Sequence, residues 1–306
     1  MSLVLDGITK IYGAQHALDE ISFSAKSGEI IGLLGPNGAG KTTTMKILTC
    51  FIPATKGNAE VCGFDVVKQP LDVRQHIGYL PEHNPLYLEM YVKEYLELIA
   101  RIFKISKPQK RISELIEMTG LTREQSKKIQ YLSKGYRQRV GIAQAMMHDP
   151  EVLILDEPTS GLDPNQLVDI RSLIHELGKE KLVVFSTHIM QEVQALCDRV
   201  IILDKGKLVA DDPISALSQR VKGAMVLTVG FKDEIDLRKL ENLEGLIEIK
   251  SIGQNEYKLT VDEQLDIREE IFDFAVANGN KILGMSQEKI SVESVFQQIT
   301  SNQKEP

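Results

Sequence analysis

The segment 35–43 contains the residue types, at the right spacing, for a loop that wraps the phosphates of a nucleotide. It fits the pattern G-x-x-x-x-G-K-[ST] and consists of Gly35, Pro36, Asn37, Gly38, Ala39, Gly40, Lys41, Thr42 and Thr43. Glycine lets backbone N–H groups approach phosphate oxygens closely and adopts positive φ without strain. Lys41 adds a positive charge for the β- and γ-phosphates, and the Thr42 hydroxyl can bind Mg²⁺.

The segments on either side of this loop are the ones that would position it. Residues Glu29–Leu34 predict a buried strand, and residues Thr43–Cys50 predict a helix. A helix N-terminus attracts anions because its first N–H groups are free and its dipole is positive there. A strand, a glycine-rich loop and a helix in this order predict a phosphate site rather than an ordinary glycine-rich turn.

Two adjacent carboxylates, Asp156 and Glu157, follow the apolar run Val152–Leu155. Burying one acid without a partner is costly, and burying two is more so, unless a metal ion lies nearby. We therefore expect Asp156 to support Mg²⁺ and Glu157 to polarise the water that attacks the γ-phosphate. An ordinary strand end capped by acids is the alternative, which the upstream phosphate loop disfavours.

The composition predicts a packed protein with one domain of ordinary size and a smaller one. The chain has 306 residues, of which 42% are hydrophobic and 26% charged. A net charge of −7 argues against a general nucleic-acid coat, although a local basic patch is compatible with it. The three cysteines lack metal-ligand spacing and suit buried thiols in a reducing compartment. No secretory signal is visible and apolar runs are of strand length, so we expect any membrane role to be exercised from outside the bilayer.

The first 222 residues predict an α/β domain. Strands are expected at Leu3–Thr9 and Ala17–Ala25, and a helical subdomain at about 85–150. After residue 150, strands and helices alternate, which implies a parallel sheet with helices on its faces. The remaining expected elements of this part are Asn58–Val67, Ile77–Leu80, Leu88–Phe103, Ile112–Met118, Gly135–Met147, Gln166–Leu177, Leu182–Ser186, Ile189–Ala195 and Val200–Asp204.

A second domain is expected at residues 223–306, since the composition shifts near Ser218 to Gly223. The pattern of this part predicts the order β-α-β-β-α-β, which is typical of a small ferredoxin-like α+β domain. A last helix, Val292–Thr300, would have Ser291 as its N-cap. The other expected elements are Met225–Gly230, Asp236–Asn242, Ile247–Ser251, Tyr257–Val261, Ile267–Ala277 and Lys281–Met285.

The segment Leu132-Ser133-Lys134-Gly135-Tyr136 resembles the signature loop of ABC-type ATPases, usually Leu-Ser-Gly-Gly-Gln. Lys134 and Tyr136 depart from that pattern, and Ser133 alone would be read as a plain N-cap. The order of motifs is also the family's, because the phosphate loop, the signature, the acidic pair, Ser160-Gly161-Leu162-Asp163 and His188 follow one another. The resemblance covers about residues 2–220 and implies a P-loop ABC cassette, with a RecA-like core, an antiparallel β subdomain and a helical subdomain.

The resemblance also implies the roles of residues outside the phosphate loop. Tyr12 resembles the aromatic residue that stacks on adenine, although a lone Tyr there would more often be a surface residue. His188 resembles the switch histidine that contacts the γ-phosphate, although a lone His would more often be a core or turn residue. Ser133 and Gly135 would bind the γ-phosphate held by a second cassette, and Asp163 would communicate across the interface. The resemblance thus implies a dimer, expected as a homodimer, with two ATP molecules between the subunits.

Glu82 departs from the family, which usually has Gln after a segment like Ile77-Gly78-Tyr79-Leu80-Pro81. A carboxylate of similar length could reach Mg²⁺, but it would repel phosphate oxygens if it were left unpaired. We keep Glu82 as a candidate ligand of Mg²⁺ or a coupling residue. A solvated loop acid is the alternative.

The closest branch by resemblance is the ATP-binding subunits of ABC-2-type exporters. Glu82, the altered signature, the appended domain and Ser291-Val292-Glu293-Ser294-Val295-Phe296 support it, and Tyr79 to Leu96 resembles the gliding-motility-associated ATPases of Bacteroidota. This implies an ATPase with ATP and Mg²⁺ that drives an integral membrane permease from the cytoplasmic face of the inner membrane, without nucleic acid as partner. The coupling surface is expected near Glu82 to Phe103. A soluble ABC ATPase acting on nucleic acid or ribosomes is the alternative.

Overall fold

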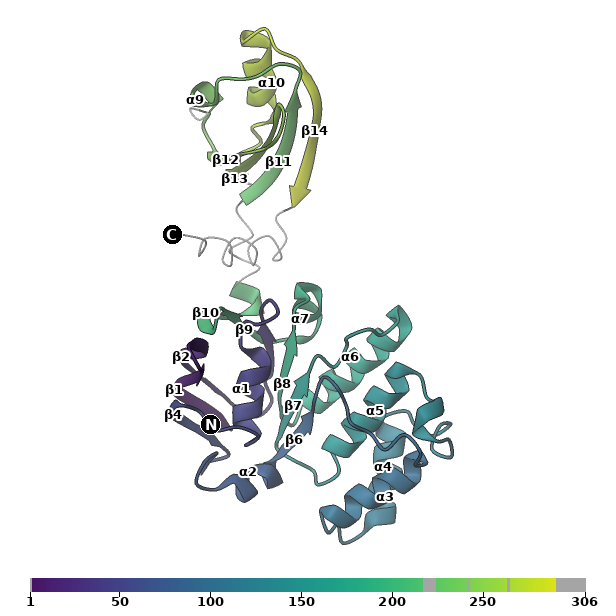
Figure 1. Cartoon of the computed structure of the whole chain (residues 1–306). Coiled ribbons are helices and arrows are strands. Elements are labelled where there is room, and N and C mark those ends of the chain that lie inside the picture. The colour runs from purple at the N-terminus through teal and green to yellow at the C-terminus, as the bar shows by residue number, and fades with distance from the viewer. Residues whose placement is uncertain (1, 217–223, 241–242, 263–264, 290–306) are drawn as a thin grey trace. The chain divides into compact units, whose positions relative to one another are not determined.

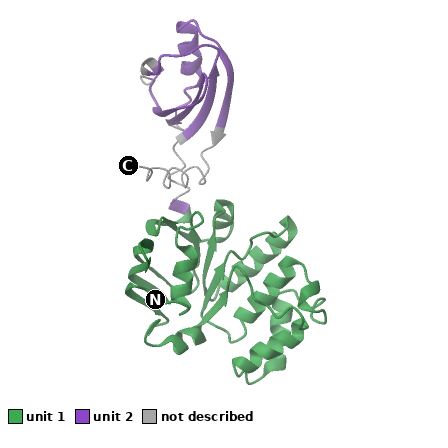
Figure 2. Ribbon diagram, in the orientation of Figure 1, with its two compact units in different colours: residues 1–214 green, residues 215–306 purple. Residues whose placement is uncertain are grey.

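The computed structural model describes residues 2–216, 224–240, 243–262 and 265–289. The chain divides into two compact units, which Figure 2 distinguishes by colour: unit 1, residues 1–214, and unit 2, residues 215–306. The sequence-based boundary at residue 222 lies in the stretch 217–223, outside the described residues, and stays a prediction. The helix predicted at Val292–Thr300 also lies outside them.

A six-stranded sheet forms the centre of unit 1 (Figure 1). Its strand order is β10-β9-β3-β8-β7-β6, and all neighbouring pairs are parallel except β10 with β9. Every residue of the three central strands β3, β8 and β7 is buried, as expected for parallel strands covered on both faces. The strands are β3 Ile30–Leu34, β6 Ile77–Leu80, β7 Val152–Asp156, β8 Leu182–Thr187, β9 Arg199–Asp204 and β10 Lys207–Pro213.

The two faces of this sheet belong to two different hydrophobic cores. Along β7, Val152 and Ile154 pack with α1 (Lys41–Leu48) and the N-terminal strands, whereas Leu153 and Leu155 pack with the helical part of the unit. This alternation follows from the period of two in a strand. The helices on the second side include α5 (Lys134–Ala145) and α6 (Pro164–Gly178); α7 spans Met190–Leu196.

A four-stranded antiparallel sheet covers the α1 side, with the strand order β2-β1-β4-β5. Its strands are β1 Leu3–Tyr12, β2 Gln15–Ala25, β4 Lys56–Val61 and β5 Phe64–Asp65. The helix α2, Pro70–His76, was not predicted, since of its seven residues only Val73 is buried and no apolar period is visible. Strand β10 was also missed, because it is polar and lies at the edge of the sheet.

The helical subdomain lies between β6 and β7, as the sequence predicts. It consists of α3 (Val92–Ile102), α4 (Pro108–Met118), the 3-10 turn η1 (Ile129–Tyr131) and α5. Helix α3 begins four residues later than predicted, because Tyr91 is its N-cap in a capping box with Glu94. Helix α4 begins four residues earlier than predicted, at Pro108, where proline suits the first helical position.

Unit 2 contains elements in the order β-α-β-β-α-β, as predicted. Its four strands form an antiparallel sheet in the order β12-β13-β11-β14, and its core includes Leu227, Leu259 and Phe274. The elements are β11 Ala224–Phe231, α9 Leu237–Leu240, β12 Leu246–Gly253, β13 Glu256–Asp262, α10 Arg268–Ala277 and β14 Ile282–Lys289.

Within the described ranges, no helix is both long and apolar enough to cross a bilayer. Cys50, Cys62 and Cys197 are free thiols, and each residue is partly rather than fully buried. Burial raises the pKa of all three thiols, which makes them poor nucleophiles at neutral pH.

Candidate active site

The loop between β3 and α1 has the backbone geometry that its glycines were expected to permit. Gly38 and Gly40 have φ of 82° and 108°, in the region that glycine adopts without strain. A side chain at Gly35 would collide with the carbonyl oxygen of Leu203, so only glycine fits there. The sequence therefore produces a tight turn that leads directly into the N-terminus of α1.

Lys41 is the ammonium group of this loop and is only 6% exposed. Its Nζ donates hydrogen bonds to the carbonyl oxygens of Gly35 at 2.7 Å and Pro36 at 3.2 Å. Burial lowers the pKa of Lys41, while the negative charges of Glu157, Asp156 and Glu82 oppose this shift. The ammonium is thus held by loop carbonyls alone and can be stabilised further by an anion.

Asp156 lies at the end of β7 and joins the loop to the neighbouring strand. Its Oδ1 accepts hydrogen bonds from Ser186 Oγ at 2.5 Å and from Thr42 Oγ1 at 3.3 Å. Hydroxyl and carboxylate oxygens are the ligands that Mg²⁺ prefers, so Thr42 and Asp156 fit a magnesium ion. Within the described residues no group of three or more His, Cys, Asp or Glu side chains could hold a metal by itself.

Glu157 is positioned by an unusual backbone conformation. Its φ of 49° is rare for a residue other than glycine, and its N–H donates to Ser186 Oγ at 2.9 Å. Both carboxylate oxygens lie 3.1 Å from Nδ1 of His188, which comes from the end of β8. Burial raises the pKa of Glu157, against the hydrogen bond and charge of His188. A carboxylate with a raised pKa is a stronger base near neutral pH.

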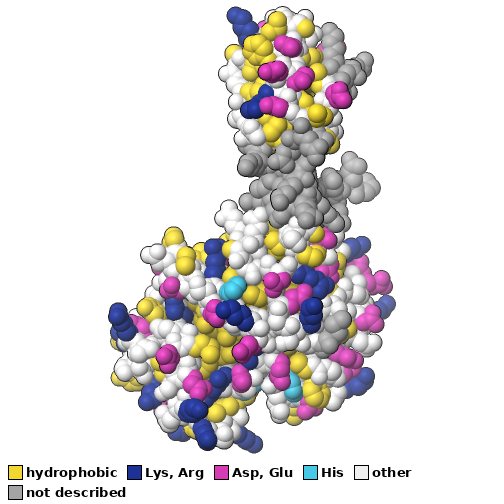
Figure 3. Space-filling view, turned by 180° about the vertical axis from the view of Figure 1, so that it is seen from behind, with side chains coloured by type: hydrophobic (Ala, Val, Ile, Leu, Met, Phe, Trp, Pro, Cys, Tyr) yellow, Lys and Arg dark blue, Asp and Glu magenta, His cyan; other side chains and the backbone are white. Residues whose placement is uncertain are grey.

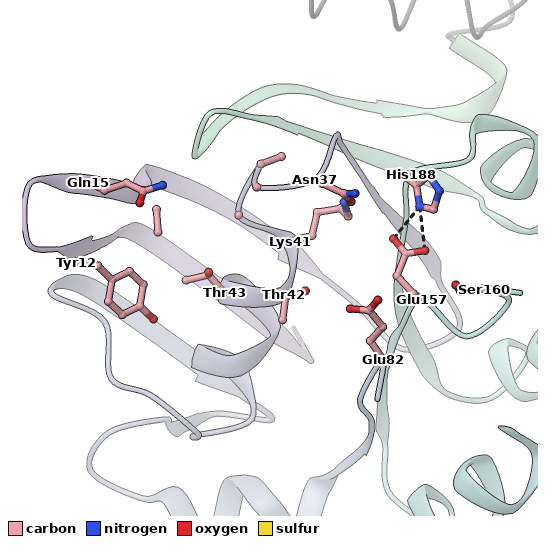
Figure 4. Close-up of a pocket in the computed structure, with 14 residues that line it drawn as sticks. Tyr12, Gln15, Asn37, Lys41, Thr42, Thr43, Glu82, Glu157, Ser160 and His188 are labelled. Atoms are coloured by element: carbon pink, nitrogen blue, oxygen red, sulfur yellow. Dashed lines mark hydrogen bonds and ion pairs between the residues drawn. The ribbon is translucent and has the colours of Figure 1, made fainter. Parts of the chain in front are cut away.

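These groups surround one cavity of about 470 Å³, the nucleotide pocket (Figure 4). Tyr12 and Gln15, from the β1–β2 hairpin, lie on one side of the loop, and Glu82, Glu157 and His188 lie on the other. Gln15, Ala17 and Ser160 also line the pocket, although they were not predicted as site residues. Gln15 could have been found, because it pairs with Tyr12 in the hairpin. The lining residues are Tyr12, Gln15, Ala17, Asn37, Gly38, Ala39, Gly40, Lys41, Thr42, Thr43, Glu82, Glu157, Ser160 and His188.

Six predicted site residues are not among the residues that line this pocket. Three of them are bonded to residues that do line it, since Gly35 and Pro36 accept from Lys41 and Asp156 accepts from Thr42. The other three are Ser133, Gly135 and Asp163. Ser133 is the N-cap of α5 and Asp163 is the N-cap of α6. Gln166 connects the two caps, because its Nε2 donates to Ser133 Oγ at 3.3 Å and its N–H donates to Asp163 Oδ1 at 2.9 Å. Ser133 and Asp163 are thus linked to each other through Gln166 and do not line the pocket of their own chain.

An apolar groove of about 310 Å³ opens where the helical subdomain meets the sheet. Phe51 and Tyr79 meet edge to face, with ring centroids 5.7 Å apart, and Phe103 stacks on His148 at 4.1 Å. Of the coupling region predicted at Glu82 to Phe103, only Phe103 lines this groove. Leu86 of the same region is a core residue with 8% of its surface exposed. The groove is lined by Thr49, Phe51, Arg74, Ile77, Tyr79, Phe103, Gln144, Ala145 and His148.

Two known proteins are similar to most of this chain. The family model "ABC transporter" matches residues 18–160. The chain is 40% identical over 215 residues to the bacitracin transport ATP-binding protein BcrA of Bacillus licheniformis, covering 70% of each chain. It is 31% identical over 305 residues to the linearmycin resistance ATP-binding protein LnrL of Bacillus subtilis (strain 168), covering 97% of this chain and 98% of that protein.

A solved structure supports the same assignment. The dimeric, post-hydrolysis ATP-binding cassette MJ0796, bound to ADP and Pi, matches with a TM-score of 0.64 and 27% identity, over 69% of this chain and 98% of that one. The match confirms the α/β cassette fold that the motifs predicted. The chain belongs to the ABC transporter family, as an ATP-binding subunit that hydrolyses ATP.

Proposed function

We propose that this protein powers an ABC-2-type exporter, as a pair of identical copies attached to an integral membrane permease on the cytoplasmic face of the inner membrane. The observation that carries the proposal is the separation of Ser133 and Gly135 from the nucleotide pocket of the same chain. Their N–H and hydroxyl groups lie at the start of α5, where a phosphate is favoured, yet they line no part of that pocket. A second copy facing the first would bring the two groups together around ATP.

Within this pair, Lys41 and the loop N–H groups would hold the β- and γ-phosphates. Thr42 and Asp156, with Glu82 as a third candidate, would hold Mg²⁺, which neutralises charge on the phosphate oxygens when bound. Glu157 would accept a proton from the attacking water, and His188, 3.1 Å from both its oxygens, would orient that carboxylate and contact the γ-phosphate. Hydrolysis would remove the γ-phosphate that joins the two copies and let them separate.

Tyr12 provides the first prediction, since its ring is half exposed beside the pocket. Stacking of a base on an aromatic ring contributes about 1–3 kcal/mol. We therefore expect Tyr12→Ala to weaken ATP binding by roughly 5- to 150-fold, whereas Tyr12→Phe keeps it within about twofold. Equilibrium binding of ATP and of inorganic triphosphate measures the effect. Equal losses for both ligands would contradict stacking on adenine.

The apolar groove is the proposed docking site of a short permease helix. Phe51 lies in it with 68% of its surface exposed, and the groove surface is mainly apolar. Because β6 leads from the groove residues Ile77 and Tyr79 to Glu82 in the nucleotide pocket, the permease could sense the nucleotide through this strand.

The second prediction concerns Phe51, which lines the groove but not the nucleotide pocket. Phe51→Asp should abolish co-purification with the permease from detergent and leave ATP binding by the purified chain within about twofold, since it places a charge in an apolar interface. Val168→Asp, on α6 and also exposed, is the matched control that should retain the permease. Full recovery of the complex with the Phe51 variant would exclude this groove as the docking site.

Co-purification of the natural protein tests the whole proposal. A polytopic membrane partner is the expected result, whereas ribosomes or nucleic acid would favour the alternative of a soluble ABC ATPase. The relatives do not favour that alternative, since BcrA is named for bacitracin transport and LnrL for linearmycin resistance. For the cellular process, the resemblance of residues 79–96 supports gliding motility. A deletion strain that glides normally but gains antibiotic sensitivity would support drug export instead.

We also infer that residues 223–306 form a ferredoxin-like accessory domain. Support comes from its element order and from the antiparallel sheet order, in which β11 lies between β13 and β14. The match to LnrL extends over 97% of this chain, so that relative has a counterpart of this domain. No motif in it points to chemistry, and a structural role is the proposal that its packed core supports.

A further inference from the structure

We propose that the basic turn, residues 101–111, which comprises the end of α3, the connection to α4 and the first residues of α4, binds the anionic lipid surface of the membrane beside the permease. The location relative to the permease rests on the proposed function, but the lipid binding itself can be tested on the chain alone. The turn carries five cations, no acid, and two exposed apolar residues. The cations are Arg101, Lys104, Lys107, Lys110 and Arg111.

The charge of this turn contrasts with that of the whole chain, whose net charge is −7. On the face shown in Figure 3, Lys and Arg side chains of unit 1 lie among Asp and Glu side chains. The turn instead has no Asp or Glu from residue 101 to 113, and the first turn of α4 is also free of acids. The positive end of the α4 dipole therefore adds to the lysine charges. Two acids from outside this stretch, Glu114 and Asp149, line the shallow pocket beside Lys107, Lys110 and Arg111 and pair with Arg111 at 3.6 and 3.4 Å.

Most of these cations are available to a ligand. Arg101, Lys104 and Lys107 are all exposed. None of them takes part in the ion pairs found among the described residues. Lys110 pairs with Glu114 at 3.7 Å on the surface, a contact that is easily exchanged. Arg111 is the exception, because its guanidinium donates hydrogen bonds to the carbonyl oxygens of Met146 and Met147 and so attaches the turn to the end of α5.

Two apolar side chains accompany the lysines. Ile102 is 63% exposed and Phe103 is 39% exposed, directly between Arg101 and Lys104. Cations next to exposed apolar side chains are typical of surfaces that lie in the headgroup layer, where charge meets phosphate and the apolar group reaches the acyl chains. Nucleic acid would use the charges but gives no reason for an exposed Ile102, so a lipid surface is the better fit.

The turn also borders the groove proposed for the permease. His148 lines both the groove and the shallow pocket that contains Lys107, Lys110 and Arg111. Its ring stacks on Phe103, and its Nε2 lies 3.0 Å from the carbonyl oxygen of Ile77. A permease helix in the groove would therefore leave the basic turn next to it.

Flotation of the full-length chain with vesicles tests the proposal. We expect binding to vesicles that are about one-third phosphatidylglycerol, little binding to pure phosphatidylcholine, and loss of binding at roughly 0.5 M salt. Each lysine near an anionic surface contributes about fivefold, so the triple variant Lys104→Glu, Lys107→Glu and Lys110→Glu should lower the partition coefficient by at least roughly 100-fold. Ile102→Asn should lower it by a smaller factor.

A matched triple variant, Lys26→Glu, Lys56→Glu and Lys179→Glu, makes the same change in net charge at exposed sites elsewhere in unit 1. It should retain binding within about threefold, and both triple variants should keep the ATP affinity of the natural chain. The proposal would be overturned if the natural chain bound neutral vesicles as well as anionic ones, or if the control triple variant lost as much vesicle binding as the variant of the turn. It would also be overturned if the variant of the turn lost binding to RNA but kept its binding to vesicles. Failure of the permease to co-purify would sink the proposed function but not the lipid binding.

Discussion

The Glu157→Gln variant should bind ATP as well as the natural protein and hydrolyse it about 10²- to 10⁴-fold more slowly. The amide keeps the size of the side chain but cannot accept a proton from water. Burial raises the pKa of Glu157, so above the ordinary pKa of a glutamate the ionised carboxylate lowers the free energy of unfolding. The amide carries no such charge, and we therefore expect the variant to stay folded at pH 7. Turnover is measured by phosphate release, and the ATP-bound pair, which should accumulate, by size-exclusion chromatography.

Glu82→Gln is the control for Glu157, because it removes a carboxylate from the same pocket. Glu82 has a half-exposed side chain, and in the structure its recorded partner is His83, at 3.9 Å. We expect turnover within about tenfold of the natural value, since the amide can still reach Mg²⁺ and repels phosphate less. If Glu157→Gln retained full turnover while Glu82→Gln lost it, the proton acceptor would have to be reassigned to Glu82.

The dependence of turnover on pH follows from the same group. As the pH falls through the raised pKa of Glu157, the carboxylate takes up a proton and can no longer act as a base. The acid limb of the turnover profile should therefore lie above the range of an ordinary glutamate, and it should disappear from the residual activity of Glu157→Gln.

Local sequence was sufficient to predict the phosphate loop, the buried strands and most of unit 2. Continuous apolar runs such as β7 and a glycine pattern with strict spacing are short-range signals that tertiary contacts only reinforce. Helix α2 was missed because its conformation depends on the burial of a single residue, Val73. Strand β10 was missed because its conformation depends on pairing with β9. Neither contact leaves a period in the sequence.

The site was predictable by motif but not by geometry. The motifs named Glu157 and His188 separately, and only the fold shows both oxygens of Glu157 within 3.1 Å of one ring nitrogen. Ser186, which bonds to Asp156 and to the N–H of Glu157, has no motif of its own. The groove is less predictable still, because its walls come from residues between 49 and 148 that meet only after folding.

The requirement for two copies predicts that Ser133→Glu separates ATP binding from ATP hydrolysis. Ser133 is exposed and lines no part of the pocket in its own chain, so the single chain should bind ATP within about twofold of the natural affinity. In the closed pair, the new carboxylate would face the γ-phosphate bound by the other copy and repel it. Turnover should fall by roughly 10²- to 10³-fold, as when a donor to developing charge is lost.

Ser160→Glu is the matched control, since Ser160 lines the pocket of its own chain. The same carboxylate placed there should weaken ATP binding by the single chain, whereas Ser133→Glu should not. Measured in a Glu157→Gln background, Ser133→Glu should also prevent the ATP-dependent pair seen by size-exclusion chromatography. Normal turnover by Ser133→Glu would refute the two-copy site, because the start of α5 would then not meet the nucleotide of the other copy. Normal turnover by a chain that stays monomeric at saturating ATP would refute it as well.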